Sequence, residues 1–134
     1  MTQESPLTTR WLEFALRDLG VAKHLFATYS PTPCEIICYQ CQQAAEKALK
    51  ALYFFLALPG GVPRTHDLSL LLDQMRNKTD IADSVYDLAE ELTPYGTAAR
   101  YPGDLFFDVS AAQQALAAAE ALIAWVRETL GNAH

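Results

Sequence analysis

The sequence is short of positive charge. Its 134 residues contain 10 lysines and arginines against 16 aspartates and glutamates, which gives a formal net charge of −6 at pH 7. A protein that covers an extended nucleic acid needs clustered Lys and Arg, because these replace the counterions on the phosphates. The composition therefore excludes a broad nucleic-acid surface and leaves room only for a small basic site. Residues 1–67 hold six basic and six acidic side chains, so residues 68–134 carry the whole −6.

The segments that mark membrane and secreted proteins are also lacking. No uninterrupted apolar run approaches the roughly 18–20 residues that span a bilayer. The first residues do not join a basic region to an apolar one, as a secretory signal does. The three cysteines are an odd number within eight residues and make no disulfide framework. Together with a length typical of one domain, these absences predict a single cytoplasmic domain over residues 1–134.

Apolar residues recur every three to four positions along almost the whole sequence, which is the period of a helix. No segment alternates between apolar and polar residues as a strand does. Gaps that hold Pro and Gly separate the apolar stretches. We therefore predict an all-α, up-and-down four-helix-type bundle with an additional short helix, about five helices in all. The expected helices cover about residues 6–30, 33–58, 68–75 and 81–92, and Thr8 or Thr9 is an alternative start for the first. A last helix is expected from Asp108 or Ser110 to about Leu130, after an irregular connection.

Residues that begin helices support these boundaries. Thr32, Pro33 and Glu35 form the pattern of a capping box, with a cap, a proline at the first helical position and a glutamate three residues after the cap. Asp67 and Asp80 are expected to cap the two short helices, because an Asp side chain accepts hydrogen bonds from first-turn amides.

Cys34, Cys38 and Cys41 have the C-x3-C-x2-C spacing of the iron–sulfur cluster in radical enzymes. That chemistry needs three thiolates that reach the irons of one cluster from a loop. Here the cysteines fall in the first turns of a predicted helix, at offsets that place them on one face. A free cysteine on such a face is a small apolar core residue. We therefore predict buried core thiols and no metal site.

A stripe of polar side chains runs along the long second helix. Gln43, Glu46 and Lys50 lie four, seven and eleven residues after Tyr39, so the four share one face. Such a stripe is typical of a solvated helix surface, on which Glu46 and Lys50 form an i, i+4 ion pair. The same residues also suit the wall of a polar binding site, and both interpretations stay open at this point.

Two loop segments carry the remaining candidates. His66 lies at the start of the short third helix, and its imidazole can act as an acid or a base near pH 7. Arg100 is the only basic residue between Lys78 and Arg127, and it lies beside Tyr101. This pair suits a phosphate with a stacked base. An arginine that ties its loop to acidic helix ends gives the same pattern.

Taken together, these segments resemble the HEPN family of small helical domains in bacteria and archaea. The resemblance rests on YQCQQAAEKALKA at residues 39–51, THDL at residues 65–68 and RYP at residues 100–102. Their order and spacing fit the family along nearly the whole chain. The resemblance implies a bundle that pairs into homodimers. It also implies a role in nucleotide or RNA biology, commonly beside a minimal nucleotidyltransferase.

The resemblance also separates this chain from the ribonucleases of the family. Those members carry an arginine, usually with a polar residue next to it, and then a histidine after four to six intervening residues. In this sequence Leu105, Phe106 and Phe107 occupy the histidine positions, and Tyr101-Pro102 replaces the polar residue. Without an imidazole the general acid or base is missing. The chain thus resembles the non-nuclease branch, and we expect no catalytic residue.

The resulting prediction is a homodimeric binding module that acts with a minimal nucleotidyltransferase partner in a toxin–antitoxin-like pair. We expect a nucleotide or RNA ligand in a polar cleft, no cofactor, no metal and no membrane. A metal-independent ribonuclease that uses His66 is one alternative, and a purely structural adaptor is another. The predicted nucleotide- or partner-binding residues are Gln43, Glu46, Lys50, His66, Asp67, Arg100 and Tyr101.

Overall fold

The computed structural model describes residues 6–97 and 107–132, and within them it contains helices but no strand. The predicted all-α bundle of about five helices is therefore confirmed. The helices are α1 (Pro6–Thr28), α2 (Cys34–Phe55), α3 (Leu68–Met75), α4 (Asp83–Leu92) and α5 (Val109–Asn132), and a 3-10 turn, η1 (Thr93–Gly96), follows α4 directly.

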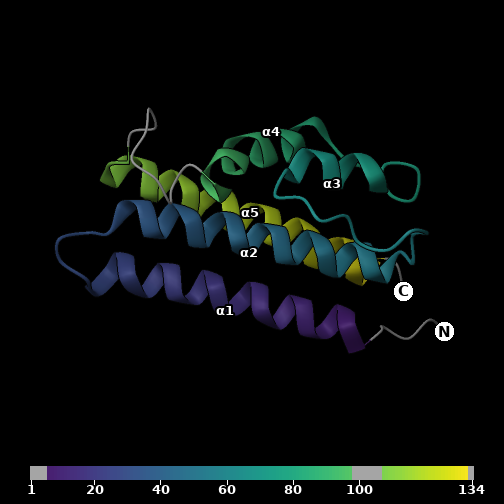
Figure 1. The fold of residues 1–134 in the computed structure, drawn as a ribbon, viewed down its shortest axis with the longest axis horizontal. Coiled ribbons are helices and arrows are strands. Elements are labelled where there is room, and N and C mark those ends of the chain that lie inside the picture. The colour runs from purple at the N-terminus through teal and green to yellow at the C-terminus, as the bar shows by residue number, and fades with distance from the viewer. Residues whose placement is uncertain (1–5, 98–106, 133–134) are drawn as a thin grey trace.

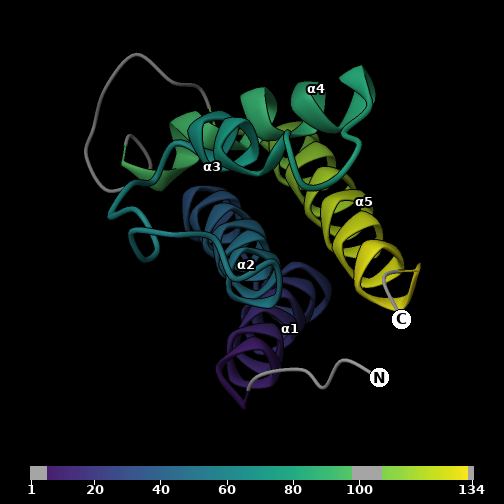
Figure 2. The ribbon, with the colours of Figure 1, turned by 90° about the vertical axis from the view of Figure 1, so that its right-hand side faces the viewer.

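Three long helices form the body of the bundle, and two short ones cover one side of it (Figure 1). α1 and α2 pack side by side and run antiparallel. α5 packs along α2 and α4 and runs in the same direction as α2. Seen from the end, α1 lies on the opposite side of α2 from α3, while α4 packs against α5 (Figure 2). Since α2 contacts all four other helices and η1, it is the central element of the fold.

The buried residues of α2 explain this central position. Ala44, Ala45, Ala48 and Ala51 are fully buried, and their small side chains allow the neighbouring helices to approach closely. Larger aliphatic side chains fill the remaining space, and each contributes roughly 1.5–3 kcal/mol when it leaves water. The largest fully buried ones are Ile37, Leu49 and Leu52 of α2, Leu68, Leu71, Leu72 and Met75 of α3, Leu92 of α4, and Leu122 and Val126 of α5.

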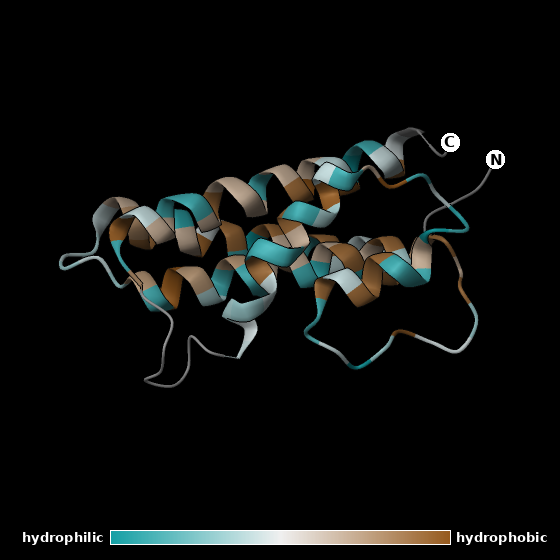
Figure 3. Cartoon of the chain, turned by 90° about the horizontal axis from the view of Figure 1, so that it is seen from above, coloured by the Kyte–Doolittle hydropathy of each residue, from teal (hydrophilic) through white to brown (hydrophobic). Residues whose placement is uncertain are grey.

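The last helix is apolar enough, by length and composition alone, to cross a membrane. An 18-residue window within Val109–Gly131 has a mean hydropathy of 1.3. Its apolar residues have another explanation, because α5 packs against α2 and α4 and buries Ala115, Leu122 and Val126 there. Polar and apolar residues are interspersed along the long helices, as expected when one face is buried (Figure 3). We therefore describe α5 as a core helix.

The predicted helix caps are correct at some positions and wrong at others. Asp67 caps α3, since its Oδ1 accepts hydrogen bonds from the amides of Ser69 and Leu70 at 3.0 and 3.2 Å. Asp80 does not cap α4, because that helix begins three residues later, at Asp83. The capping box at Thr32 is also wrong.

Pro33 occupies the N-cap position of α2, and no side chain caps this helix. The backbone carbonyl of Thr32, rather than its hydroxyl, accepts a hydrogen bond from the Cys34 amide at 2.9 Å. The last helix follows its prediction, because Oδ1 of Asp108 accepts a hydrogen bond from the Ala111 amide at 2.7 Å. Pro33 is thus the N-cap of α2 and not its first helical residue, so α2 begins one residue later than predicted.

η1 packs onto α2 through a glycine. Gly96 is buried, and a Cβ atom at this position would lie 2.8 Å from Cδ and 2.9 Å from Nε2 of Gln42. Gln42 is itself fully buried and hydrogen-bonded, so its amide has little freedom to move aside. The glycine is therefore required for the close approach of the two elements.

We predict that Gly96→Ala lowers the free energy of unfolding by about 1–3 kcal/mol, since an added methyl group overpacks the contact with Gln42. Urea denaturation followed by circular dichroism measures the change. Gly20→Ala is the matched control, because nothing lies within 4 Å of the added methyl group and Gly20 is in the interior of α1. It should stabilise the protein by roughly 0.5–1 kcal/mol. Equal effects of both substitutions would contradict the packing argument.

Candidate functional site

A buried carboxylate on α2 organises the polar residues of the predicted stripe. Glu46 is only 4% exposed. Its Oε2 accepts a hydrogen bond from Lys50 Nζ at 2.9 Å, and its Oε1 lies 3.1 Å from Gln42 Nε2 and 2.8 Å from His66 Nδ1. We refer to Gln42, Glu46, Lys50 and His66 as the Glu46 cluster.

Two features of the chain bring this cluster together. Gln42, Glu46 and Lys50 are spaced by four residues, so they stack along one face of α2. His66 comes from the turn before α3, and this turn is fastened to α2 because Gln42 Nε2 also donates to the His66 carbonyl at 3.0 Å. The Asp67 cap then sets the direction in which the chain continues as α3.

The pKa of Glu46 reflects a balance of opposing effects. Burial favours the neutral acid and on its own would raise the pKa of this carboxyl group. Hydrogen bonds from Lys50, His66 and Gln42, together with the charge of Lys50, outweigh this and lower the pKa below its ordinary value. The carboxylate is therefore ionised at neutral pH, although it lies in the core.

The Lys50 side chain is mostly buried and its charge is paired within the protein. Its side chain is 14% exposed, its ammonium pairs with Glu46, and the same nitrogen lies 5.6 Å from the centre of the Trp11 ring. Trp11 in turn stacks on Phe54 at 6.4 Å between ring centroids. The positive charge of Lys50 is thus shared between a carboxylate and an aromatic face, and little of it reaches the solvent.

His66 is the part of the cluster that faces the solvent. Its side chain is 54% exposed. Since Glu46 is ionised, the hydrogen-bond network assigns the Nδ1 proton to the bond with Oε1, which leaves Nε2 as an acceptor in the neutral ring. On protonation, Nε2 becomes a second donor. The buried carboxylate therefore orients an imidazole whose outer nitrogen is available to a ligand.

The structure gathers four of the seven predicted site residues in one hydrogen-bonded group. Glu46, Lys50 and His66 belong to the cluster, and Gln43 Nε2 donates to Gln42 Oε1 at 2.8 Å beside it. Asp67 serves as a helix cap next to His66. Arg100 and Tyr101 lie outside the described residues.

Sequence reasoning missed two contributors, Gln42 and Trp11. Gln42 bridges Glu46 and the turn at His66, yet it lies outside the predicted stripe because only Gln43 has the offset from Tyr39. Its spacing of four residues before Glu46 is the signal that could have found it. Trp11 comes from α1, and no local pattern links it to Lys50.

The three cysteines are buried, as the sequence predicts. Cys38 and Cys41 are fully buried and Cys34 nearly so, all within the apolar core. Burial raises the pKa of both Cys38 and Cys41 to about 12, so both are neutral thiols at pH 7. Within the described residues, no group of His, Cys, Asp and Glu side chains is arranged to hold a metal ion.

The fold and the cluster define a small helical-bundle domain with a polar site between its central helix and the turn before α3. The model of the HEPN domain family matches residues 8–129, which is most of the chain. The chain therefore belongs to the HEPN family.

Solved structures agree with this assignment. TT1696 from Thermus thermophilus has a TM-score of 0.76 and 26% sequence identity, over 90% of this chain and 96% of that one. ST0689, an archaeal HEPN homologue, has a TM-score of 0.71 and 26% identity, over 97% of this chain and 99% of that one. No curated protein matches the sequence significantly.

We predict that Glu46→Gln lowers the free energy of unfolding at pH 7 by roughly 1–3 kcal/mol, because buried donors lose a charged acceptor. Urea denaturation measures the loss. Glu120→Gln is the matched control, since it removes an exposed ion pair with Lys23, in which the two side chains are 49% and 53% exposed. It should change the stability by less than about 1 kcal/mol.

A comparison of the wild type with Glu46→Gln also tests the lowered pKa of Glu46. A carboxyl group whose pKa is lowered by folding stabilises the protein above its unfolded pKa, about 4.3, and this contribution disappears as the pH falls through the folded pKa. The difference between wild type and Glu46→Gln should therefore shrink as the pH is lowered from about 5 to about 3. A difference that stays constant over this range would contradict the ionised cluster.

Proposed function

We propose that this HEPN domain is a non-catalytic binding module that works as a homodimer with a minimal nucleotidyltransferase partner in a toxin–antitoxin-like pair. In this proposal a nucleotide phosphate contacts His66 at the solvent end of the Glu46 cluster. One observation carries the proposal: the Nδ1 atom of a half-exposed imidazole is held 2.8 Å from a buried carboxylate.

The charges of the cluster favour His66 over Lys50 as the phosphate contact. The charges of Glu46 and Lys50 cancel each other within their ion pair. Protonation of His66 therefore makes the net charge of the three groups positive, and this charge is located at the surface. A protonated imidazole donates a strong hydrogen bond to a phosphate oxygen. Such a local site is compatible with a net charge of −6, because it needs no extended basic surface.

Membership of the HEPN family supports the homodimer and the nucleotidyltransferase partner. The outer face of α1 offers apolar surface for such contacts. Leu7 and Val21 are 49% and 44% exposed, and Phe14 lies midway between them at the same helical face. Arg10 and Arg17 lie over the Phe14 ring at 5.4 and 5.1 Å from its centre. This face combines an apolar stripe with positive charge.

Calorimetry tests the nucleotide site. AMP and ATP are titrated into the chain and into its complex with a minimal nucleotidyltransferase encoded beside it. His66→Ala should weaken binding roughly tenfold or more, because it removes a hydrogen bond with a charged group. His24→Ala is the matched control, since His24 is exposed on α1 and outside the cluster. Absence of nucleotide affinity in both the chain and the complex would rule out the site.

The Glu46–His66 pair also favours a second candidate, a metal-independent ribonuclease. A carboxylate that holds Nδ1 of an imidazole fixes the ring so that Nε2 can act as a base and then as an acid. His66 would in this way replace the histidine that is missing after RYP. The two candidates use the same imidazole, but only the second one predicts turnover.

RNA cleavage in the presence of a chelator distinguishes the two candidates. The ribonuclease predicts cleavage that His66→Ala and Arg100→Ala abolish, while His24→Ala retains it. The binding module predicts no cleavage by any of these proteins. Cleavage that persists in both His66→Ala and Arg100→Ala would exclude the ribonuclease candidate, because the activity would not depend on the proposed residues.

A further inference from the structure

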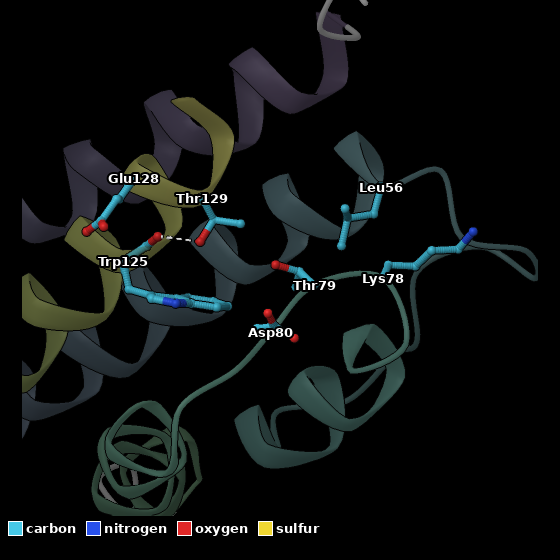
Figure 4. Close-up of a pocket in the computed structure, with 7 residues that line it drawn as sticks. All are labelled: Leu56, Lys78, Thr79, Asp80, Trp125, Glu128 and Thr129. Atoms are coloured by element: carbon cyan, nitrogen blue, oxygen red, sulfur yellow. Dashed lines mark hydrogen bonds between the residues drawn. The ribbon is translucent and has the colours of Figure 1, made fainter. Parts of the chain in front are cut away.

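A second site lies away from the Glu46 cluster, where α2 ends beside α5. A pocket of about 380 Å³ opens there between Leu56 of α2, Thr79 and Asp80 of the connection before α4, and Trp125 of α5 (Figure 4). Its volume is within the range of about 300–1,000 Å³ that is common for small-molecule sites. None of its lining residues belongs to the Glu46 cluster.

The fold does not use the carboxylates of this pocket. Asp80 has the sequence position of a helix cap, yet α4 begins at Asp83 and no side chain caps it. Glu128 also lines the pocket. Within the described part of the chain, neither Asp80 nor Glu128 has a hydrogen-bond or ion-pair partner. As far as the described residues are concerned, both negative charges can pair with a ligand.

Lys78 also lines the pocket, but three other lining side chains suit a cation, namely Trp125, Thr129 and Leu56. The Trp125 ring extends toward Thr79 and Asp80, whereas the ammonium of Lys78 points away from it (Figure 4). The Thr129 hydroxyl donates to the Trp125 carbonyl at 2.8 Å, so its remaining capacity is that of an acceptor. An indole face is the best aromatic surface for a cation, and Leu56 adds an aliphatic wall.

We propose that this pocket binds an alkylammonium ligand, a small aliphatic amine of the polyamine class. One ammonium group lies against the Trp125 indole, a second pairs with Asp80, and the methylene chain between them packs on Leu56. The free carboxylates disfavour an anion such as a nucleotide in this pocket. The site is therefore distinct in chemistry from the proposed phosphate contact at His66.

NMR titration tests the proposal, because the chain has two tryptophans and each reports on one site. Putrescine should shift the indole N–H signal of Trp125 and leave that of Trp11 unchanged. Butanediol is the matched ligand, since it has the same carbon chain without the charges, and it should shift neither signal. Equal shifts with the diol, or shifts of both indoles with putrescine, would overturn the proposal.

Substitutions separate the pocket from the general acidity of the chain. Asp80→Asn should weaken putrescine binding about two- to fivefold, the effect of one exposed ion pair. Asp87→Asn makes the same change at an exposed site on α4 outside the pocket, and it should leave the affinity unchanged. Equal weakening by both variants would show attraction to the acidic surface and overturn the proposal.

Two further measurements complete the test. Trp125→Leu should also weaken binding about two- to fivefold through loss of the cation–π contact, with folding checked by circular dichroism. Nα-acetyllysine amide presents the same ammonium as a protein side chain. Tighter binding of putrescine supports a free amine as the ligand, whereas tighter binding of the lysine amide would overturn the free amine in favour of a partner's lysine.

Discussion

A carboxylate in the core of a helical bundle is tolerated only when its charge is paired and its oxygens are hydrogen-bonded, and much of this structure satisfies that condition for Glu46. The desolvation of one such charge costs several kcal/mol. Lys50 and Gln42, one turn to either side on α2, and His66 from a distant turn, together offset this cost. The turn before α3 is held against α2 by the same contacts.

The need to pair the Glu46 charge also affects residues that form no hydrogen bond with Glu46. Gln42 can bridge α2 and the turn only while its amide stays in place, and Gly96 packs directly onto that amide. Lys50 keeps its position between Glu46 and the indole of Trp11, which links the cluster to α1. Four separate segments of the chain therefore converge on one buried charge. His66 is the exception, since its outer edge reaches the solvent and gives the cluster a chemically active surface.

Glu46 and Asp80 show how burial decides the role of a carboxylate. Glu46 is enclosed, so it must be paired within the protein, and its pKa is lowered. Asp80 is exposed and unpaired among the described residues, so water satisfies it and a ligand can replace that water. Both residues are carboxylates of the same acidic HEPN domain. Their positions in the fold give Glu46 a structural role and leave Asp80 available for the proposed ligand.

The sequence by itself determined the helical class, the number of helices, the burial of the three cysteines and the cap at Asp67, because helical spacing and capping are local properties of the chain. It also brought Gln43, Glu46, Lys50 and His66 forward as candidates. Only the tertiary structure decided that Gln42 completes the cluster, that Lys50 faces inward, and that Asp80 is free of a capping role. These outcomes depend on contacts between α1, α2 and the turn before α3, and on where α4 begins. Periodicity says which side of a helix is polar, but not which other segment will pack against it or how far its charge is removed from water.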